Sequence, residues 1–362
     1  MTRITAQPGI MDIALYQGGR SHLAGVKDVL KLSSNENPLG APPAAVEALT
    51  QAALGMHLYP STDHESLRAA IGEVWGLEPA RLICGVGSDE VLQFVSQAFS
   101  GPGDEIIYTE HGFSMYPILA NMAGATPICV PETERVVDVD VILNAVTERT
   151  RIVFLANPAN PTGTMLADGE LERLADALPD HVILVIDGAY AEFVAGYDGG
   201  ISLARARSNV LVTRTFSKIY GLGGLRVGWG YGAPALIDVM TRIRQPFNLS
   251  VVQLAAAEAA VRDTAWVKDC AELNIEQRAR LTGALRQLGL ACDDSHANFV
   301  LARADDVAEA DAAEAALNAD GILIRRVAGY GFPTGLRITV GNAEQTGRVI
   351  AALTRWREGT TT

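Results

Sequence analysis

The sequence predicts an α/β fold, in which a mostly parallel sheet flanked by helices is followed by a smaller α+β domain. Short β-branched runs alternate with longer helical patterns through the first two thirds of the chain. These runs are continuously apolar, which is typical of strands buried on both faces of a parallel sheet. After about residue 245 the alternation ends, and two long helical stretches precede a strand–helix–strand pattern.

Five apolar runs are the predicted strands of the first region. They are RLIC (81–84), EIIY (105–108), RIVFLA (151–156), VILVI (182–186) and NVLVT (209–213). Helices are predicted between them over residues 89–99, about 139–146 and 168–178. LRVGWG (225–230) is a further candidate strand, for which an antiparallel direction is one option. The alternation of strands with helices is that of an α/β domain.

The chain is expected to divide into three regions. Residues 1–40 are polar and punctuated by glycine and proline, which predicts an arm that joins the small domain. Residues 41–245 are expected to form the large domain and residues 246–362 the small one. In the small domain, helices are predicted at about 251–263 and 266–288, followed by ANFVLAR, AEAALNADG, ILIRRV and LRITVG. A length of 362 residues exceeds one ordinary domain.

Composition narrows the classes of partner and location. The formal net charge of −13 disfavours a surface for nucleic acid or an anionic membrane. The four cysteines form no CxxC pair and the six histidines show no metal-ligand spacing, so neither a disulfide framework nor a metal site is expected. No signal peptide or membrane-length apolar span is visible, and we expect a cytoplasmic protein.

Five unusual loops each follow a predicted strand of the large domain. They are GVGSDE (85–90), TEHGFSMY (109–116), NPANPTG (157–163), DGAY (187–190) and TFSK (215–218). In open α/β sheets the carboxyl ends of the strands form the ligand crevice. We therefore expect these loops to converge at one edge of the sheet.

The residues in these loops point to one cofactor. Lys218 is one of only four lysines in a chain with twenty-five arginines, and only an amine can readily lose its proton and form a carbon–nitrogen bond. Asp187 ends a wholly apolar strand, where an unpaired carboxylate is costly, and it suits a protonated ring nitrogen. Guanidinium groups and helix N-termini both bind phosphate, and the residues that would form a phosphate cup are Ser88, Asp89, Thr215, Ser217 and Arg226. Lysine, carboxylate and phosphate cup together describe a site for pyridoxal 5′-phosphate (PLP).

The chain resembles the fold-type I PLP-dependent aminotransferases, in the histidinol-phosphate aminotransferase branch. The motifs that carry the resemblance extend from the N-terminal arm almost to the C-terminus: SSNENPLG (33–40), LYP (58–60), GVGSDE, NPANPTG, VIDGAY, TFSKIYGLGGLRVGW and GYGFPTGLRITVG (329–341). The resemblance implies a sheet of seven strands. It also implies ping-pong transamination between L-histidinol phosphate and 2-oxoglutarate in histidine biosynthesis.

The resemblance assigns Lys218, Asp187 and Tyr190 as catalytic residues. Lys218 is similar to the Schiff-base lysine that also moves the proton, and Asp187 to the residue that keeps the pyridine nitrogen protonated. Tyr190 and Asn160 resemble the donors to the ring hydroxyl. Phe113 occupies the position of the aromatic residue that stacks on the ring.

The same resemblance assigns the phosphate and substrate contacts. Ser88 and Asp89 would bind the cofactor phosphate through backbone amides, together with Thr215, Ser217 and Arg226. Tyr59 matches a tyrosine that reaches the phosphate from the neighbouring subunit, which implies a homodimer.

Arg337 matches the arginine that binds the α-carboxylate of the substrate. Arg325 and Arg326 could assist with a substrate phosphate, but adjacent side chains on a strand face opposite ways. Only one of the pair should point inward, and we favour Arg325. Tyr16 and Asn37 are further candidate substrate contacts.

Other activities remain open from the sequence. An aromatic amino-acid (tyrosine/phenylalanine) aminotransferase and a PLP-dependent decarboxylase of a phosphorylated amino acid share the cofactor. A nicotinamide-dependent oxidoreductase is disfavoured because GVG (85–87) and GLG (221–223) do not complete the GxGxxG motif. A non-catalytic binding module is disfavoured because Lys218 and Asp187 are both present. His111, beside the expected crevice, is interpreted as a loop residue.

Overall fold

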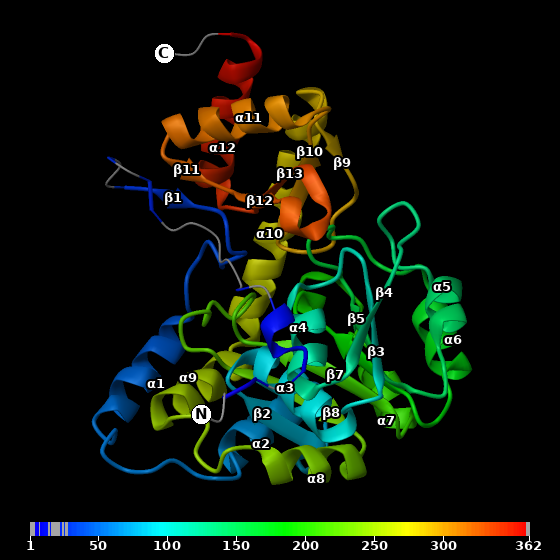
Figure 1. The fold of residues 1–362 in the computed structure, drawn as a ribbon. Coiled ribbons are helices and arrows are strands. Elements are labelled where there is room, and N and C mark those ends of the chain that lie inside the picture. Colours follow the sequence, from blue (N-terminus) through cyan, green and yellow to red (C-terminus); the bar gives the residue numbers. More distant parts are fainter. Residues whose placement is uncertain are drawn as a thin grey trace.

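The computed structural model describes residues 4–6, 8–13, 15, 22–23, 25 and 28–359. They form a large lobe around one sheet and a smaller lobe with a second sheet, as Figure 1 shows. In the large lobe the seven-stranded sheet has the order β2-β8-β7-β6-β5-β3-β4. Its strands are β2 (Leu82–Gly85), β3 (Glu105–Thr109), β4 (Thr126–Val130), β5 (Thr150–Ala156), β6 (Ile183–Asp187), β7 (Val210–Thr215) and β8 (Gly228–Gly232).

The direction of the strands confirms the predicted sheet. All neighbours run parallel except β8, which is antiparallel to both β2 and β7. The five apolar runs are strands, and LRVGWG contains the antiparallel β8. Strand β4 has no counterpart among the predicted strands. Its residues Thr126 and Cys129 are exposed and it contains Pro127, which is tolerated because β4 is an edge strand.

Helices cover both faces of the large sheet. The helices of this lobe are α1 (Pro43–Ala53), α2 (Glu65–Trp75), α3 (Gly87–Phe99), α4 (Met115–Ala123), α5 (Val139–Ala145), α6 (Glu170–Ala177), α7 (Ile201–Ala206), α8 (Pro234–Ile243) and α9 (Val251–Arg262), with short 3₁₀ turns η1 (Ile10–Asp12), η2 (Pro79–Arg81) and η3 (Ala191–Phe193). Along β5, Ile152 and Phe154 pack beneath α3, α4 and α8, whereas Val153 and Leu155 face the opposite apolar cluster. This alternation explains why the strand is apolar throughout.

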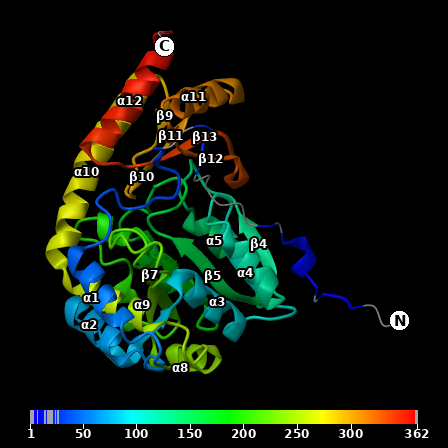
Figure 2. The same ribbon diagram turned by 90° about the vertical axis from the view of Figure 1, so that its left-hand side faces the viewer.

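The small lobe places an antiparallel sheet against three helices. Its sheet has the order β12-β13-β10-β9, and a parallel pair joins β1 of the arm to β11. Its elements and β1 are β1 (Leu30–Lys31), α10 (Thr264–Gln287), β9 (Ala291–Cys292), β10 (Phe299–Arg303), α11 (Val307–Ala319), β11 (Ile322–Leu323), β12 (Arg325–Val327), η4 (Ala328–Tyr330), β13 (Phe332–Thr339) and α12 (Ala343–Arg357). Figure 2 shows the long helix α10 running from the large lobe to the small lobe.

The start of each of the last four helices is set by a side-chain cap. An oxygen of the cap accepts a hydrogen bond from a backbone N–H of the first turn, which would otherwise have no partner in the helix. The caps are Ser250 for α9, Asp263 for α10, Asp306 for α11 and Asn342 for α12. Helix α9 packs against α1 and α2 of the large lobe. The expected domain boundary near residue 245 stays a prediction.

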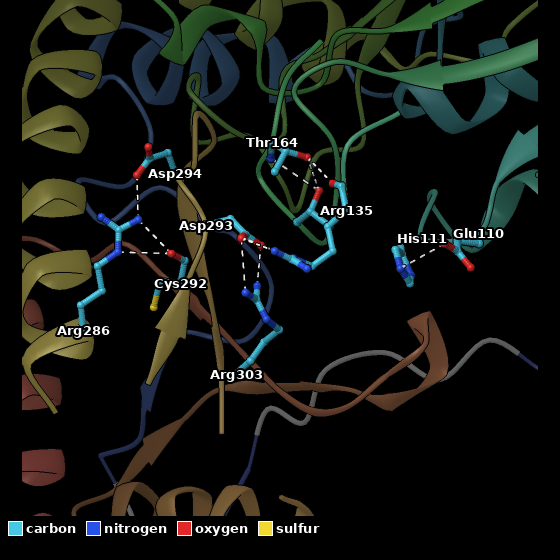
Figure 3. A network of polar contacts seen from close by, with 10 residues as sticks. Glu110, His111, Arg135, Thr164, Arg286, Cys292, Asp293, Asp294 and Arg303 are labelled. Carbon is cyan, nitrogen blue, oxygen red and sulfur yellow. Dashed lines mark hydrogen bonds and ion pairs between the residues drawn. The ribbon is translucent and has the colours of Figure 1, made fainter. Parts of the chain in front are cut away.

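Ion pairs and hydrogen bonds join the two lobes beside the sheet edge. Asp293, between β9 and β10, accepts hydrogen bonds from Arg135 of the large lobe at 2.7 and 2.8 Å and from Arg303 at 2.5 Å, and Figure 3 shows both guanidinium groups directed at this carboxylate. Burial alone would raise the pKa of Asp293, but the two arginines hold it below its usual value. His111 Nδ1 also lies 2.8 Å from the Tyr330 carbonyl oxygen, so this loop residue contacts the small lobe.

In the part of the chain that the structure describes, none of the helices has both the length and the apolar character needed to cross a membrane. The expected cytoplasmic location stays a prediction.

Candidate active site

A cavity of about 170 Å³ lies at the carboxyl ends of the large-lobe strands and is closed on one side by the small lobe. Twelve of the residues predicted from the sequence line it: Ser88, Asp89, Phe113, Asn160, Asp187, Tyr190, Thr215, Ser217, Lys218, Arg226, Arg325 and Arg337. The convergence expected from the strand-end loops is therefore observed.

Lys218 follows β7 and extends its amine into this cavity. The Nζ atom donates a hydrogen bond to the Ser34 carbonyl oxygen at 3.2 Å and lies 5.8 Å from the centre of the Tyr190 ring. Burial, and then the positive charge of Arg337, lower the pKa of Lys218 from 10.5 to about 8. The amine therefore loses its proton more readily than a surface lysine, as a nucleophile or a general base requires.

Asp187, the last residue of β6, is a buried carboxylate held by two hydroxyl groups. Tyr116 Oη donates to its Oδ2 at 3.0 Å, and Thr213 Oγ1 donates to its Oδ1 at 3.3 Å. Burial raises the pKa of Asp187 to about 6, although the Tyr116 hydrogen bond opposes the shift. A protonated ring nitrogen against this carboxylate would supply the positive charge that stabilises its ionised form.

The expected phosphate cup lies where α3 and β8 meet. Arg226 adopts a left-handed backbone (φ 56°) and donates from Nη1 to Ser217 Oγ at 2.9 Å and from Nη2 to Asp89 Oδ2 at 2.6 Å. Helix α3 starts at Gly87, and the amides of a first helical turn lack partners within the helix. A Cβ atom on Gly228 of β8 would lie 2.2 Å from the Ser88 amide nitrogen, so only glycine allows β8 to approach this closely.

Two arginines of the small lobe face each other across neighbouring strands of the cavity wall. Arg325 of β12 is the register partner of Arg337 of β13, so their side chains share one face of the sheet. Arg337 donates from Nη1 to Asn160 Oδ1 at 2.6 Å and from Nη2 to the Ser33 carbonyl oxygen at 3.1 Å. Because like charges directly opposite each other are unfavourable, this face suits an anionic ligand.

Arg326 faces the other side of β12. Its Nη1 lies 2.5 Å from Asp311 and 3.4 Å from Glu314 of α11. The structure therefore places Arg325, and not Arg326, on the cavity, as alternation along a strand requires.

The comparison with known families decides the class of this protein. The sequence profile of the aminotransferase class I and II family matches residues 27–353. The chain belongs to this family. The prediction of an enzyme with the fold of the PLP-dependent aminotransferases is thus confirmed.

Two relatives and one solved structure, all named histidinol-phosphate aminotransferases, are similar to the chain over nearly its whole length. The chain is 64% identical over 358 residues to a histidinol-phosphate aminotransferase of Ruegeria pomeroyi, which covers 99% of both chains. It is 61% identical over 351 residues to the enzyme of that name from Jannaschia sp., covering 97% of this chain and 98% of the relative. A solved histidinol-phosphate aminotransferase from Sinorhizobium meliloti, in complex with pyridoxal-5′-phosphate, is 27% identical, with a TM-score of 0.90 over 99% of this chain and 100% of that chain.

Of the three other predicted residues of this aminotransferase, the two that the structure describes do not line the cavity. Tyr16 lies outside the described residues. Tyr59 is 82% exposed and stacks on Phe247 with ring centres 4.6 Å apart. Asn37 is not among the cavity residues, and its amide donates to the Ile219 carbonyl oxygen at 2.7 Å and to Cys270 Sγ at 3.2 Å.

Sequence reasoning missed other residues of the site. The cavity is also lined by Ser33, Ser34, Asn35, Ala156, Pro158, Ala189 and Tyr330. Asn35 belongs to the same SSNENPLG motif as Asn37, and the motif does not reveal which of its two asparagines points inward. Tyr116 lies in TEHGFSMY, one of the five strand-end loops. Its hydrogen bond to Asp187 joins the ends of two separate strands, so the sequence of the loop alone does not reveal it. Tyr330 reaches the cavity from η4, where its hydroxyl lies 3.2 Å from Ser114 Oγ.

Proposed function

We propose that the chain is a histidinol-phosphate aminotransferase that uses PLP to transfer an amino group between L-histidinol phosphate and 2-oxoglutarate. The observation that carries the proposal is the pair Arg325 and Arg337, which face each other on the wall of the cavity that holds Lys218. Two relatives of this name, at 64% and 61% identity, support it.

The residues of the cavity fit PLP group by group. Ser88 at the start of α3, with Ser217 and Arg226, would hold the phosphate. Asp187 would accept the proton of the ring nitrogen in a hydrogen bond, and its raised pKa reflects a buried charge that this proton would balance. When bound, PLP supplies an electron-withdrawing ring that stabilises negative charge at the α-carbon of the substrate.

Lys218 carries out the proton transfers in this proposal. With a pKa of about 8, a substantial fraction of the amine is neutral near pH 8 and can take the proton from the α-carbon and return it to the cofactor side. Tyr190 and Asn160 line the same cavity, where they would donate to the ring hydroxyl. Phe113 would contact the ring face.

The arginine pair explains how one site accepts two substrates. Histidinol phosphate carries a phosphate dianion, whereas glutamate and 2-oxoglutarate carry carboxylates, and a guanidinium fork binds both kinds of group. Arg337 would bind the anionic group of each substrate. Arg325 would add the second positive charge that a phosphate dianion requires.

We also propose a homodimer in which Tyr59 reaches the cavity of the partner subunit. Tyr59 is largely exposed to solvent in the single chain. The other apolar side chains of its loop, Leu54, Met56 and Leu58, are also 63–79% exposed. Several exposed apolar side chains within one loop indicate an interaction surface. A second copy of the chain would bury it and bring the Tyr59 hydroxyl to a phosphate site.

A substrate panel tests the proposed activity. The purified chain, loaded with PLP, would be assayed with histidinol phosphate, phenylalanine, tyrosine and threonine phosphate as donors, each with 2-oxoglutarate as acceptor. We expect the highest kcat/KM for histidinol phosphate. A higher value for phenylalanine or tyrosine would instead identify an aromatic amino-acid aminotransferase, and release of carbon dioxide from threonine phosphate would identify a decarboxylase.

A further inference from the structure

Asn35 joins the N-terminal arm, the small lobe and Tyr190 in one buried network. Its side-chain Nδ2 donates to Tyr190 Oη at 2.9 Å, and the two residues are 1% and 4% exposed. Tyr190 follows β6 in the large lobe, whereas Asn35 follows β1, which pairs with β11 of the small lobe. The bond therefore crosses from one lobe to the other at the wall of the cavity.

The direction of this hydrogen bond follows from the anchors of Asn35. The Thr339 hydroxyl accepts the Asn35 backbone N–H at 3.0 Å and donates its own proton to Asn35 Oδ1 at 3.3 Å. The oxygen of the amide is thus occupied by Thr339, which leaves Nδ2 to face Tyr190. Asn298 also donates to the Asn35 carbonyl oxygen at 2.9 Å. These contacts hold Asn35 in a left-handed backbone conformation (φ 57°) that asparagine tolerates.

We propose that Asn35 is a positioning residue that directs the hydroxyl proton of Tyr190 into the cavity. The amide N–H occupies an acceptor lone pair of Tyr190 Oη, and a hydroxyl cannot donate its proton toward a donor. The ring is fixed as well, because it lies edge-on to Phe299 with centres 5.2 Å apart. The remaining direction for the proton is the cavity, which both Asn35 and Tyr190 line.

The network also links this proton to the position of the small lobe. Thr339 ends β13 and Asn298 precedes β10, so Asn35 is held by the lobe that carries Arg325 and Arg337. A shift of the small lobe would move the amide away from Tyr190. The orientation of one donor in the large lobe thus depends on the lobe that binds the substrate anion.

The inference rests on the proposed function for the use of the Tyr190 proton, and the test separates the two. A donor to the ring oxygen of PLP stabilises the form that carries more negative charge on that oxygen, so its loss raises the pH midpoint of the visible absorbance of the PLP-loaded chain. We expect Tyr190→Phe and Asn35→Gly each to raise this midpoint by about 0.5–1 unit, the worth of one hydrogen bond. Asn35→Asp should raise it at least as much, because its carboxylate also adds negative charge. Glycine keeps the left-handed backbone, and aspartate keeps the shape but replaces the donor with an acceptor.

A double-mutant cycle shows whether Asn35 acts through Tyr190. In the Tyr190→Phe background, Asn35→Gly should cause no further rise. An equal rise with and without the hydroxyl, or no rise from Asn35→Gly where Tyr190→Phe causes one, overturns the inference but leaves the proposed function intact. Asn37→Ala is the matched control, since its amide contacts Ile219 and Cys270 on the same arm, and it should leave the midpoint unchanged.

A readout without cofactor decides the case in which Tyr190→Phe leaves the midpoint unchanged. That result would remove Tyr190 from the proposed function. The ¹³Cζ NMR signal of Tyr190 in the unliganded chain, assigned by its loss in Tyr190→Phe, reports the hydrogen bond itself. We expect Asn35→Gly to shift this signal and Asn37→Ala to leave it in place. An unshifted signal in Asn35→Gly would show that the amide does not bind Oη.

Discussion

Tyr116 donates a hydrogen bond to the Asp187 carboxylate at 3.0 Å, and both side chains are buried. Tyr116 comes from α4, after β3, and Asp187 ends β6, so the bond joins two strand ends of the large sheet. The Tyr116 ring is itself fixed by stacking on Phe154, with ring centres 4.8 Å apart. The carboxylate is thus oriented before any ligand arrives.

Removing the charge of Asp187 should abolish most of the activity. Asp187→Asn keeps the shape and can still accept the Tyr116 hydrogen bond, but it cannot stabilise a protonated ring nitrogen. We expect kcat for transamination to fall at least ~10²-fold, the scale seen when a group that stabilises transition-state charge is lost. Tyr116→Phe removes one hydrogen bond only and should cost about tenfold or less. Comparable losses in the two variants would contradict the role of the charge.

The raised pKa of Asp187 also predicts a pH dependence of PLP binding. Below about pH 6 the carboxyl group of the unliganded chain is neutral and cannot pair with a ring cation. The affinity for PLP should therefore fall as the pH drops through this value, and the fall should be absent in Asp187→Asn. Fluorescence titration of the unliganded chain with PLP between pH 5 and pH 8 measures it. A parallel fall in the variant would assign the effect to another group.

Lys218 should lower the stability of the unliganded chain at neutral pH. Its pKa falls from 10.5 to about 8 on folding, so the unfolded chain binds the extra proton between these values. The penalty is complete below about pH 8 and disappears as the pH rises to 10.5. The full shift corresponds to about 3 kcal/mol, but the side chain keeps some solvent access, and we expect ~1–2 kcal/mol.

Lys218→Met provides the measurement. Urea unfolding of the PLP-free chains at pH 7 should show the variant to be more stable than the parent, and the difference should shrink between pH 8 and pH 10.5. A variant that is less stable at pH 7 would mean that the contacts of the amine outweigh its desolvation.

Arg325 should distinguish the two substrates of the proposed reaction. Arg325→Gln removes one of two positive charges on the cavity wall. We expect kcat/KM for histidinol phosphate to fall ~10–10²-fold, the worth of a charged hydrogen bond, with a smaller loss for glutamate. Arg326→Gln is the matched control, because Arg326 pairs with Asp311 and Glu314 on the other face of β12. Equal losses for both substrates in Arg325→Gln would refute the assignment.

A single methyl group at Gly228 should disturb the phosphate site. The Cβ atom of Gly228→Ala would lie 2.2 Å from the Ser88 amide nitrogen and 2.4 Å from the Gly87 carbonyl carbon, so the start of α3 must move. We expect the affinity for PLP to fall at least ~10-fold, as two or more phosphate contacts are displaced. Gly224→Ala, in the same motif, has no atom within 4 Å of the added Cβ and should bind PLP normally. Equilibrium titration with PLP compares the three chains.

The exposed loop around Tyr59 should be required for self-association. Met56 is 72% exposed in the single chain, so Met56→Arg should not disturb the fold but should place a charge in the proposed interface. We expect light scattering after gel filtration to show a dimer for the parent and a monomer for the variant. Val307→Arg, on the small lobe at 47% exposure, should remain dimeric. A monomeric parent chain would overturn the proposed assembly.

Local patterns in the sequence predicted the framework of the fold, because a strand that is buried on both faces has a continuously apolar sequence. Each of the five apolar runs in the large lobe is a strand, since both of its faces must be apolar. Strand β4 was not predicted, because this edge strand contains exposed residues and a proline and is not continuously apolar. Helices α1, α2, α4, α7, α8 and α12 were not predicted as elements.

The residues of the candidate site were likewise predictable from the sequence only in part. Residues such as Lys218, Asp187 and Arg226 could be chosen from the sequence because loops at the carboxyl ends of parallel strands must share one edge, and their chemistry then identified the ligand. Strand alternation predicted that only one of Arg325 and Arg326 points inward. It did not say which one, and the structure places Arg325, the residue we favoured, on the cavity. The choice between Asn35 and Asn37 was not, since no periodicity governs an irregular arm.

The sequence by itself determined the alternation of buried strands with helices in the large lobe, the groups available for chemistry and the edge of the sheet at which they gather. Only the tertiary structure decided which of these groups touch. Asn35 meets Tyr190 across 155 residues and Arg337 meets Asn160 across 177. Such contacts depend on how the lobes pack, and packing is set by the shapes of many distant side chains together, which no local pattern in a sequence encodes.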